Sequence, residues 1–354
     1  MARLRVVLVG TGGWARSHVQ AMRECHDVEL VGICGHHNRE RLQALCAEAG
    51  GIAGDLDLAA LLQRTRPDIV DIACNPHFRL EGMRLAAAAG ARLVNLEKPL
   101  ALTPGEAYAI AALCRETGLL LTVNHQKKFL PAWAKLRRLI DAGTFGQVRL
   151  LRATCQGNLL EQGTHVVDML LFFNAGRPLE WVMGQVGDLE GLDKAQAAAP
   201  DAAVAAMAFA NGVRVLFECG TVGRALPDET NKWHQFAVEV YGEAGHATVT
   251  LNRTLSVTTY ADGHTFTEPS SWDRDYLHAL SAHLDAAAAY VRDPAVGHIS
   301  DLDHSLPSFD AVMAIYASAC RGGRIRLPCR FEDSLMDELG ALRRASGRPG
   351  ADRL

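Results

Sequence analysis

The feature that most constrains this chain is a glycine-rich turn directly after an apolar N-terminal strand. Residues 4–9, LRVVLV, have the length and composition of a buried strand, and GTGGWARSH follows at once. Gly10, Gly12 and Ala15 give a GxGxxA pattern. The first glycine permits a tight turn, the second lets a pyrophosphate approach the backbone, and the small alanine lets the next helix pack closely. A strand before this motif and a helix after it indicate a dinucleotide site, the alternative being an ordinary tight turn.

Short apolar runs alternate with amphipathic stretches throughout the first third of the chain. The runs predict strands buried on both faces, at residues 4–9, 28–34, 68–74, 91–96 and 119–123. The stretches 39–50 and 104–118 carry helical periodicity and close on glycine. This alternation predicts an α/β fold with a doubly wound parallel sheet, a Rossmann dinucleotide-binding domain, over residues 1–123.

The pattern changes after residue 123. Helices are expected at 131–143, 161–173 and 303–321, and strands at 146–157, 202–220, 234–251 and 255–268. We therefore expect a C-terminal α+β domain with a largely antiparallel open sheet at residues 124–329. A charged C-terminal tail is expected at 330–354, and its last segment, SGRPGADRL, is expected to be frayed.

Composition excludes several classes of partner. The chain has 36 basic and 40 acidic residues, a formal charge of −4, without a block of like charge, which argues against nucleic acid and anionic membranes. Its nine cysteines include no CxxC pair, as expected of reduced thiols rather than a disulfide frame or a zinc site. No apolar run reaches the roughly 20 residues of a membrane span, and the N-terminus does not resemble a signal peptide. We expect a soluble, cytoplasmic protein with a small-molecule partner.

The end of the second strand predicts which dinucleotide binds. Gly35 stands where a carboxylate usually binds the 2′-hydroxyl of NAD, and His36, His37, Asn38 and Arg39 follow it. The missing carboxylate, together with Arg39 and the nearby Arg41, favours NADP. The alternative is that both arginines only solvate the next helix, which leaves NAD open.

Glu97, Lys98 and Pro99 follow the fourth of these strands directly. Ligands of open parallel sheets bind beyond the carboxyl ends of the strands, so the Lys98 ammonium is expected to reach the cofactor crevice. Pro99 fixes one backbone dihedral and allows a cis peptide bond, which would hold the lysine in a defined pose. By itself, the segment can also be interpreted as a solvated strand exit.

Glu161, His165 and Asp168 are spaced for one face of a helix. An imidazole beside a carboxylate suits proton transfer near neutral pH, and a lysine close to the substrate oxygen can share that proton. A core histidine satisfied by a neighbouring acid and a surface face with ordinary charge pairs are the alternatives. No metal site is predicted, because this pattern lacks a cysteine or second histidine as a ligand.

In the order and spacing of five segments, the chain resembles the glucose-fructose oxidoreductase / inositol 2-dehydrogenase / MocA family over most of residues 4–328. The segments are GTGGWA, EKPLALTPGEA, VNHQKKFLPAWAKLRRLIDAGTFGQV, LLEQGTHVVDML and AVMAIYASACRGGRIRLP. The resemblance implies a Rossmann domain, a second domain whose open sheet forms a homodimer or homotetramer, and bound NAD or NADP. It also implies reversible hydride transfer between the nicotinamide and a carbinol carbon of a sugar, cyclitol or related polyol.

Matching these motifs position by position implies three roles. Lys98 would bind the reacting hydroxyl, His165 would be the general base in oxidation and the acid in reduction, and Glu161 would take the acidic position before it. The residues expected at the cofactor are Gly10, Gly12, Gly13, Trp14, Ala15, Gly35, His36, Arg39, Asn75, Pro76, Glu97 and Lys98. The residues expected at the substrate are Lys98, Gln126, Lys128, Glu161 and His165.

The chain departs from the family pattern at several of these positions. Glu161 replaces the usual aspartate, and Lys128 replaces a more typical arginine, so a point charge takes the place of a bidentate contact. After the third buried run, the loop Asn75-Pro76-His77 stands where the family often has Thr-Pro, and Arg79 stands where it has a histidine. Substrate choice is therefore not carried over.

Three functions remain open from the sequence. The first is an NAD(P)-dependent dehydrogenase or reductase acting on CH–OH groups, with Lys98 and His165 as its proton relay. The second is a glycosidase that keeps NAD bound and works by oxidation, elimination and reduction. The third is a non-enzymatic, dinucleotide-sensing regulator, which would have no need of Lys98, Glu161 and His165.

Overall fold

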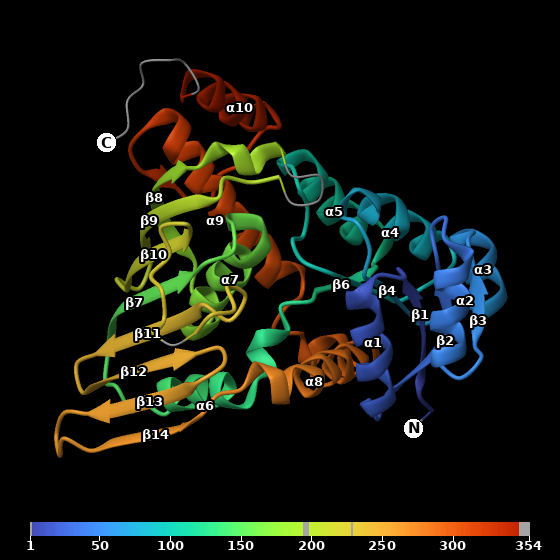
Figure 1. The fold of residues 1–354 in the computed structure, drawn as a ribbon, viewed down its shortest axis with the longest axis horizontal. Helices are drawn as coiled ribbons and strands as arrows, with labels where there is room; N and C mark the ends of the chain where they lie inside the picture. The colour runs from blue at the N-terminus through green and yellow to red at the C-terminus, as the bar shows by residue number, and fades with distance from the viewer. Residues whose placement is uncertain (1, 194–197, 228, 347–354) are drawn as a thin grey trace. The chain divides into compact units, whose positions relative to one another are not determined.

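The computed structural model describes residues 2–193, 198–227 and 229–346, and the chain divides into two compact units (Figure 1). The first contains the chain up to Leu102, then Glu106–Leu130 and Arg274–Leu306. The second contains Thr103–Gly105, Pro131–Asp273 and the chain from Pro307 onward. Each unit is therefore built from separate stretches of sequence. Of the segment expected to be frayed, only Ser346 is described, as the last residue of α10; residues 347–354 lie outside the described residues.

The first unit is built on a six-stranded parallel sheet of order β3-β2-β1-β4-β5-β6. Its elements are β1 (Leu4–Val9), α1 (Gly13–Glu24), β2 (Val28–Cys34), α2 (Arg39–Glu48), β3 (Ala53–Asp55), α3 (Leu58–Thr65), β4 (Ile69–Ile72), η1 (Pro76–Phe78), α4 (Arg79–Ala88), β5 (Leu93–Leu96), β6 (Leu120–Val123), η2 (Gln126–Phe129) and η5 (Pro294–Val296). This strand order is that of the doubly wound dinucleotide-binding fold, which confirms the predicted Rossmann sheet.

Three helices contribute residues to both units: α5 (Pro104–Thr117), α8 (Trp272–Arg292) and α9 (Leu302–Arg321). The sequence pattern at 272–292 did not predict a helix. Many of the buried positions of α8 are alanines, such as Ala279, Ala287 and Ala288, which carry a weak hydrophobic signal. In the first unit α8 packs with α1 over β1, since Leu284 and Val291 share a buried cluster with Leu4 and Met22.

The second unit is built on a nine-stranded sheet of order β14-β13-β12-β11-β7-β10-β9-β8-β15. Its elements are α6 (Pro131–Asp141), β7 (Val148–Cys155), η3 (Leu159–Gly163), α7 (Thr164–Phe173), β8 (Leu179–Gly187), η4 (Leu189–Asp193), β9 (Ala202–Phe209), β10 (Arg214–Gly220), β11 (Phe236–Gly242), β12 (Gly245–Thr250), β13 (Thr254–Thr259), β14 (Thr265–Pro269), β15 (Ile325–Arg326) and α10 (Ser334–Ser346). Among the described strands of this sheet, only the pairing of β10 with β7 is parallel, which confirms a largely antiparallel sheet.

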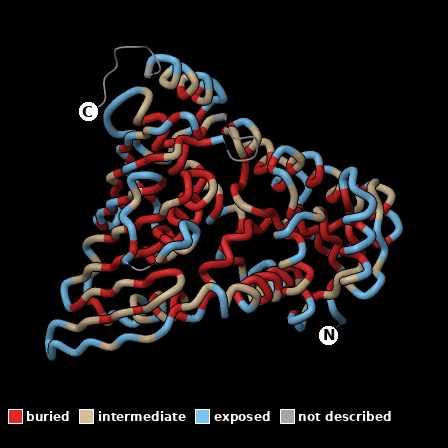
Figure 2. Tube along the Cα trace, in the orientation of Figure 1, coloured by how far each residue is buried: buried red, intermediate tan, exposed pale blue. Residues whose placement is uncertain are grey.

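Helices cover one face of this second sheet. Trp133 on α6 is fully buried and packs against Phe173 of α7 and Phe236 of β11. On the other face, Met183, Val204 and Leu216 of β8, β9 and β10 are 44%, 43% and 46% exposed. In Figure 2, β11 is buried along most of its length, whereas β14 alternates between exposed and half-buried residues. No helix among the described residues is both long and apolar enough to cross a membrane.

Candidate functional site

In the glycine turn, the backbone is tightly packed at Gly10 but has open space beside it at Gly12 and Gly13. Gly10 has φ +135°, and a Cβ there would lie 2.3 Å from the carbonyl oxygen of Ala73, so only glycine fits without movement. A Cβ on Gly12 or Gly13 would meet no atom within 4 Å. Helix α1 begins at Gly13 without a side-chain cap, so its first N–H groups can meet an anion. Ala15 is buried against the sheet.

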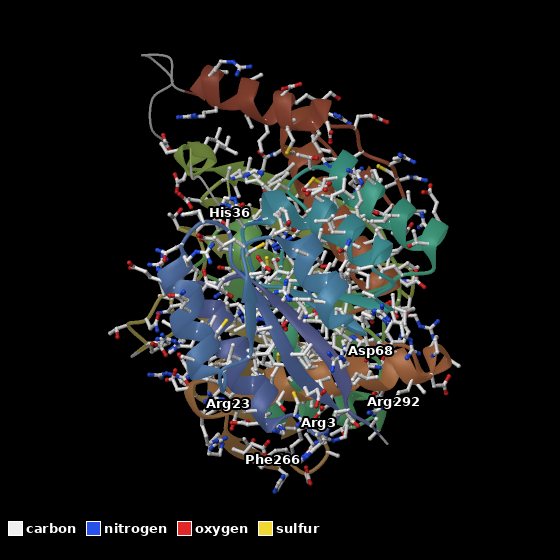
Figure 3. All side chains as sticks on the ribbon, turned by 90° about the vertical axis from the view of Figure 1, so that its right-hand side faces the viewer. Arg3, Arg23, His36, Asp68, Phe266 and Arg292 are labelled. Atoms are coloured by element: carbon white, nitrogen blue, oxygen red, sulfur yellow. The ribbon has the colours of Figure 1, made fainter. Side chains whose placement is uncertain are left out.

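The carboxyl end of β2 carries exposed basic and imidazole groups. His36 and His37 have their Nδ1 atoms 2.8 Å apart, and Figure 3 shows His36 at the opposite end of the sheet from Arg3 and Asp68. Gly35 is buried, and a Cβ there would lie 3.1 Å from Leu56 Cδ2. A carboxylate side chain at this position would therefore require its apolar neighbours to move.

Lys98 follows β5 in a loop held through its backbone. The Lys98–Pro99 peptide bond is cis. The buried guanidinium of Arg79 donates hydrogen bonds to the carbonyl oxygens of Lys98, at 3.1 Å, and of Pro99. Burial lowers the pKa of Arg79 to about 10, so its guanidinium remains a cation at neutral pH. The loop after β4, also expected at the cofactor, is ordered by Asn75, whose side chain accepts a hydrogen bond from the backbone N–H of His77.

Glu97 directly follows β5, as expected, and is buried at the centre of a polar network rather than solvated. Its Oε1 accepts hydrogen bonds from Trp14 Nε1 at 2.6 Å and from Asn124 Nδ2. It also lies 3.0 Å from Nε2 of His18, a fully buried residue of α1. The start of α1 at the glycine turn, the residue that follows β6 and the Lys98 loop are thus joined at one carboxylate oxygen.

A row of polar side chains continues from His18 across the sheet. His18 Nδ1 lies 2.5 Å from Asp71 Oδ2, and Asn95 Nδ2 donates to Asp71 Oδ1 at 2.8 Å. Asn95 Oδ1 in turn accepts from Thr122 Oγ1 and lies 2.8 Å from His283 Nε2. Because β4, β5 and β6 pair Asp71 with Asn95 and Asn95 with Thr122, these residues face the same side as α1.

The charge state of the network follows from its geometry. Both His18 nitrogens face carboxylates, so both must carry protons for the two contacts to be hydrogen bonds. Burial by itself lowers the pKa of His18, but attraction and hydrogen bonds to Asp71 and Glu97 raise it to about 10. Burial by itself raises the pKa of Glu97, but His18, Lys98 and Asn124 lower it to about 2. At neutral pH the network holds an imidazolium between two carboxylates.

The expected substrate residues Gln126 and Lys128 lie in η2 of the first unit and are both buried. The Lys128 ammonium donates to the carbonyl oxygen of Ile299 and, at 3.1 Å, to Ser300 Oγ. These contacts tie η2 to the segment before α9.

Glu161 and His165 lie in the second unit. The predicted helix begins only at Thr164, and Glu161 belongs to the π-helical turn η3 before it. Glu161 Oε2 accepts from the N–H of Asn158 at 3.4 Å, while Asn158 Oδ1 accepts from the N–H of Glu161 at 2.8 Å. This capping box fixes the turn. His165 follows on α7 and is 4% exposed. That Lys98 and His165 act on one substrate stays a prediction.

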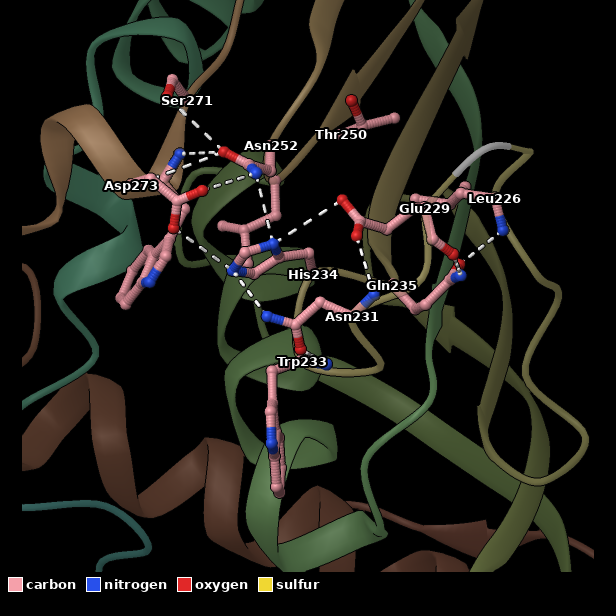
Figure 4. A network of polar contacts seen from close by, with 12 residues as sticks. Leu226, Glu229, Asn231, Trp233, His234, Gln235, Thr250, Asn252, Ser271 and Asp273 are labelled. Atoms are coloured by element: carbon pink, nitrogen blue, oxygen red, sulfur yellow. Dashed lines mark hydrogen bonds and ion pairs between the residues drawn. The ribbon is translucent and has the colours of Figure 1, made fainter.

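A loop beside η3 presents an exposed tryptophan. Gln162 Nε2 donates to the carbonyl oxygen of Trp233, whose side chain is directed away from the polar network of the loop in Figure 4. In that network, His234 lies 3.6 Å from Glu229, 3.5 Å from Asp273 and 3.2 Å from Asn252 Nδ2. The loop is therefore anchored on both sides of Trp233.

Sequence reasoning did not identify His18, Asp71 or Asn124, although each contributes to holding Glu97. One signal was present: each of three otherwise apolar strand segments, IVDI, LVNL and LLTV, contains one polar residue. Only the strand register shows that these residues are neighbours.

Two family models match the chain. One, described as the oxidoreductase family with an NAD-binding Rossmann fold, matches residues 4–125, and the other, the GFO/IDH/MocA C-terminal domain, matches residues 152–248. The chain belongs to the Gfo/Idh/MocA family. The resemblance inferred from sequence motifs is thereby confirmed.

Curated relatives match mainly over part of their length. The D-apiose dehydrogenase of Paraburkholderia graminis is 34% identical over 145 residues, which are 41% of this chain and 38% of that protein. The rhizopine catabolism protein MocA of Rhizobium meliloti is 24% identical over 300 residues, 80% of this chain and 86% of that protein. The chain thus spans about two fifths of the first of these relatives and most of the second.

Solved structures share the fold along nearly the whole chain. An oxidoreductase from Agrobacterium radiobacter in complex with NAD+, L-tartaric acid and magnesium has a TM-score of 0.79 and 18% identity, covering 96% of this chain and 100% of that one. A levoglucosan dehydrogenase in complex with NADH and levoglucosan has a TM-score of 0.78 and 19% identity, covering 93% and 100%.

The His18 network predicts a specific pH dependence of stability. Because its pKa rises from 6.5 to about 10 on folding, the contribution of His18 is complete below pH 6.5 and is lost as the pH rises toward 10. We expect the free energy of unfolding, from urea titrations between pH 6 and 10, to fall less steeply in His18→Gln than in the wild type. His283→Gln is the control, because burial holds the pKa of His283 well below its usual value and it stays neutral in this window. An unchanged slope in His18→Gln would contradict the charge assignment.

Proposed function

We propose that the protein is an NAD(P)-dependent oxidoreductase acting on a carbinol of a sugar, cyclitol or related polyol. The single observation that carries this is the Lys98 loop, because Arg79 and Glu97 fix it at the carboxyl edge of the Rossmann sheet, beside the glycine turn. Relatives named for the oxidation of D-apiose, D-glucosides and inositol support the substrate class.

The glycine turn fits the pyrophosphate of a dinucleotide. The open space at Gly12 and Gly13 and the uncapped start of α1 provide backbone N–H donors for the phosphates. Trp14 is oriented by its hydrogen bond to Glu97 and by stacking on Tyr276, with ring centroids 6.4 Å apart. When bound, the nicotinamide supplies the acceptor or donor of the hydride.

In the proposed reaction, Lys98 binds the reacting oxygen with its ammonium, which favours the developing alkoxide during oxidation. His165 accepts the hydroxyl proton in oxidation and returns it in reduction. Glu161 provides the acidic group of the η3 turn, four residues before His165.

Variants of Lys98 and His165 test the function. We expect the wild type to transfer hydride with at least one compound in a panel of pentoses, hexoses, glucosides and inositols, followed at the nicotinamide absorbance. Lys98→Met and His165→Ala should lower kcat by on the order of 100-fold or more, since each removes a group that moves or binds the proton. Lys135→Met and His246→Ala are the matched controls and should keep wild-type turnover. Undiminished turnover in both test variants would refute the assignment.

Of the two dinucleotides, NADP is the one that we propose the protein binds more tightly. Arg39 is exposed at the start of α2, and the packing around Gly35 leaves little room for the carboxylate that binds the 2′-hydroxyl of NAD. A guanidinium there is suited to a 2′-phosphate.

Equilibrium titration decides this preference. The dissociation constant is expected to be lower for NADPH than for NADH, and Arg39→Ala should weaken NADPH binding about tenfold while leaving NADH binding unchanged. Arg84→Ala, a change on the exposed side of α4, is the control. Tighter binding of NADH by the wild type would reverse the proposal.

The exposed face of the second sheet is the proposed contact of a homodimer or homotetramer. Met183, Ala206 and Leu216 are register partners in adjacent strands, so the exposed methionine and leucine side chains form one apolar row. A face of this kind on a soluble protein is normally covered by a partner.

We expect sedimentation velocity to show an oligomer that Leu216→Glu dissociates, because a carboxylate would be buried in the contact. Val296→Glu places the same charge on an exposed residue of η5 in the first unit and should leave the oligomer intact. A monomeric wild type, or an oligomer resistant to Leu216→Glu, would contradict this contact.

A further inference from the structure

A buried cation in the first unit has no part in the proposed reaction. His18 is fully buried on α1, and its imidazolium lies between Asp71 of β4 and Glu97 of the Lys98 loop. Taking an ion pair or triad out of water costs more than an apolar cluster of similar volume would. A buried ion pair can be retained in spite of this cost when it fixes a geometry that an apolar cluster could not fix.

The geometry that His18 controls is the position of one oxygen. Oε1 of Glu97 accepts hydrogen bonds from the side chains of His18, Trp14 and Asn124. Of these three donors, His18 alone carries a charge, and it is itself fixed at its other nitrogen by Asp71. Hydrogen bonds between ionised groups are about twice as strong as neutral ones. His18 is therefore the donor that most strongly restrains the Glu97 carboxylate.

Glu97 is linked in turn to both the Lys98 loop and the glycine turn. It is joined by a peptide bond to Lys98, and Arg79 holds the carbonyl oxygens of Lys98 and Pro99 from α4. It also accepts the indole N–H of Trp14 in the glycine turn. A displaced Glu97 would move the lysine and release the indole at the same time.

We propose that His18 is a positioning residue of the oxidoreductase, which holds Glu97 so that Lys98 and Trp14 stand in their working positions. The inference rests on the proposed role of Lys98. It assigns to the histidine of GTGGWARSH a task distinct from binding the dinucleotide, since its ring is directed at Asp71 and Glu97.

Loss of His18 should leave a signature in the pH profile. The charged groups that face Glu97 are His18 from α1, Lys98 from its own loop and Arg79 from α4, with Asp71 of β4 behind His18. Without His18, burial raises the pKa of the Glu97 carboxyl, so the acid limb of kcat should move to higher pH. A loss of general stability alone would lower the amount of active enzyme without moving this limb.

The test compares His18→Gln with Lys98→Met and with Thr122→Val, which removes a hydroxyl at the far end of the same polar row. The probes are NADH, titrated by its fluorescence, and the sugar or polyol with the highest turnover in the panel. We expect His18→Gln to lower kcat on the order of 10- to 100-fold, with a smaller change in KM for the sugar and weaker NADH binding. The acid limb should shift upward, and Thr122→Val should match the wild type.

The outcomes separate this inference from the proposed function. If Lys98→Met and His165→Ala both keep full turnover, the proposed function is refuted. If Lys98→Met is inactive while a folded His18→Gln has wild-type kcat, NADH affinity and pH profile, the positioning role is overturned. Should His18→Gln not fold, Glu97→Gln and Glu97→Ala decide, because only the glutamine keeps an oxygen for the three donors. Glu97→Gln is then expected to retain at least about ten times the kcat of Glu97→Ala, and equal values would overturn the inference.

Discussion

The first unit depends on one carboxylate that is buried yet charged. Glu97 stands where the fifth strand gives way to the lysine loop, and it stays ionised because an imidazolium, an indole and an amide all donate to the same oxygen. The imidazolium stays protonated in turn because a second carboxylate, Asp71, lies at its other nitrogen. Neither charge would be stable at this depth without the other.

Through these contacts the glycine turn, the first helix and the lysine loop are connected to one another. Trp14 and His18 lie four residues apart on α1, so both side chains reach Glu97. Arg79 closes the arrangement from the opposite side by binding the backbone of the lysine loop. The glycine turn and Lys98 are thereby tied to the same support.

The local sequence pattern was enough to predict the parallel sheet, the glycine turn and the antiparallel second sheet. Each of these is encoded by hydrophobic periodicity and by glycines that lie close together in the sequence. It was not enough for α8, whose buried alanines resemble those of any moderately apolar stretch. It also did not predict the π-helical turn at Glu161, since a five-residue turn is too short to change the hydrophobic period of the surrounding segment. The His18 network was missed because its members come from α1, β4, β5 and β6, and only the register places them in contact.

The ionisation of His18 is the point at which the account is most directly tested. Nitrogen-15 NMR of the imidazole reports whether both ring nitrogens carry protons. At pH 8, where an ordinary histidine is neutral, the account predicts an imidazolium at His18, consistent with its pKa of about 10. A neutral His18 ring at pH 8, with one unprotonated nitrogen facing a carboxylate, would contradict it.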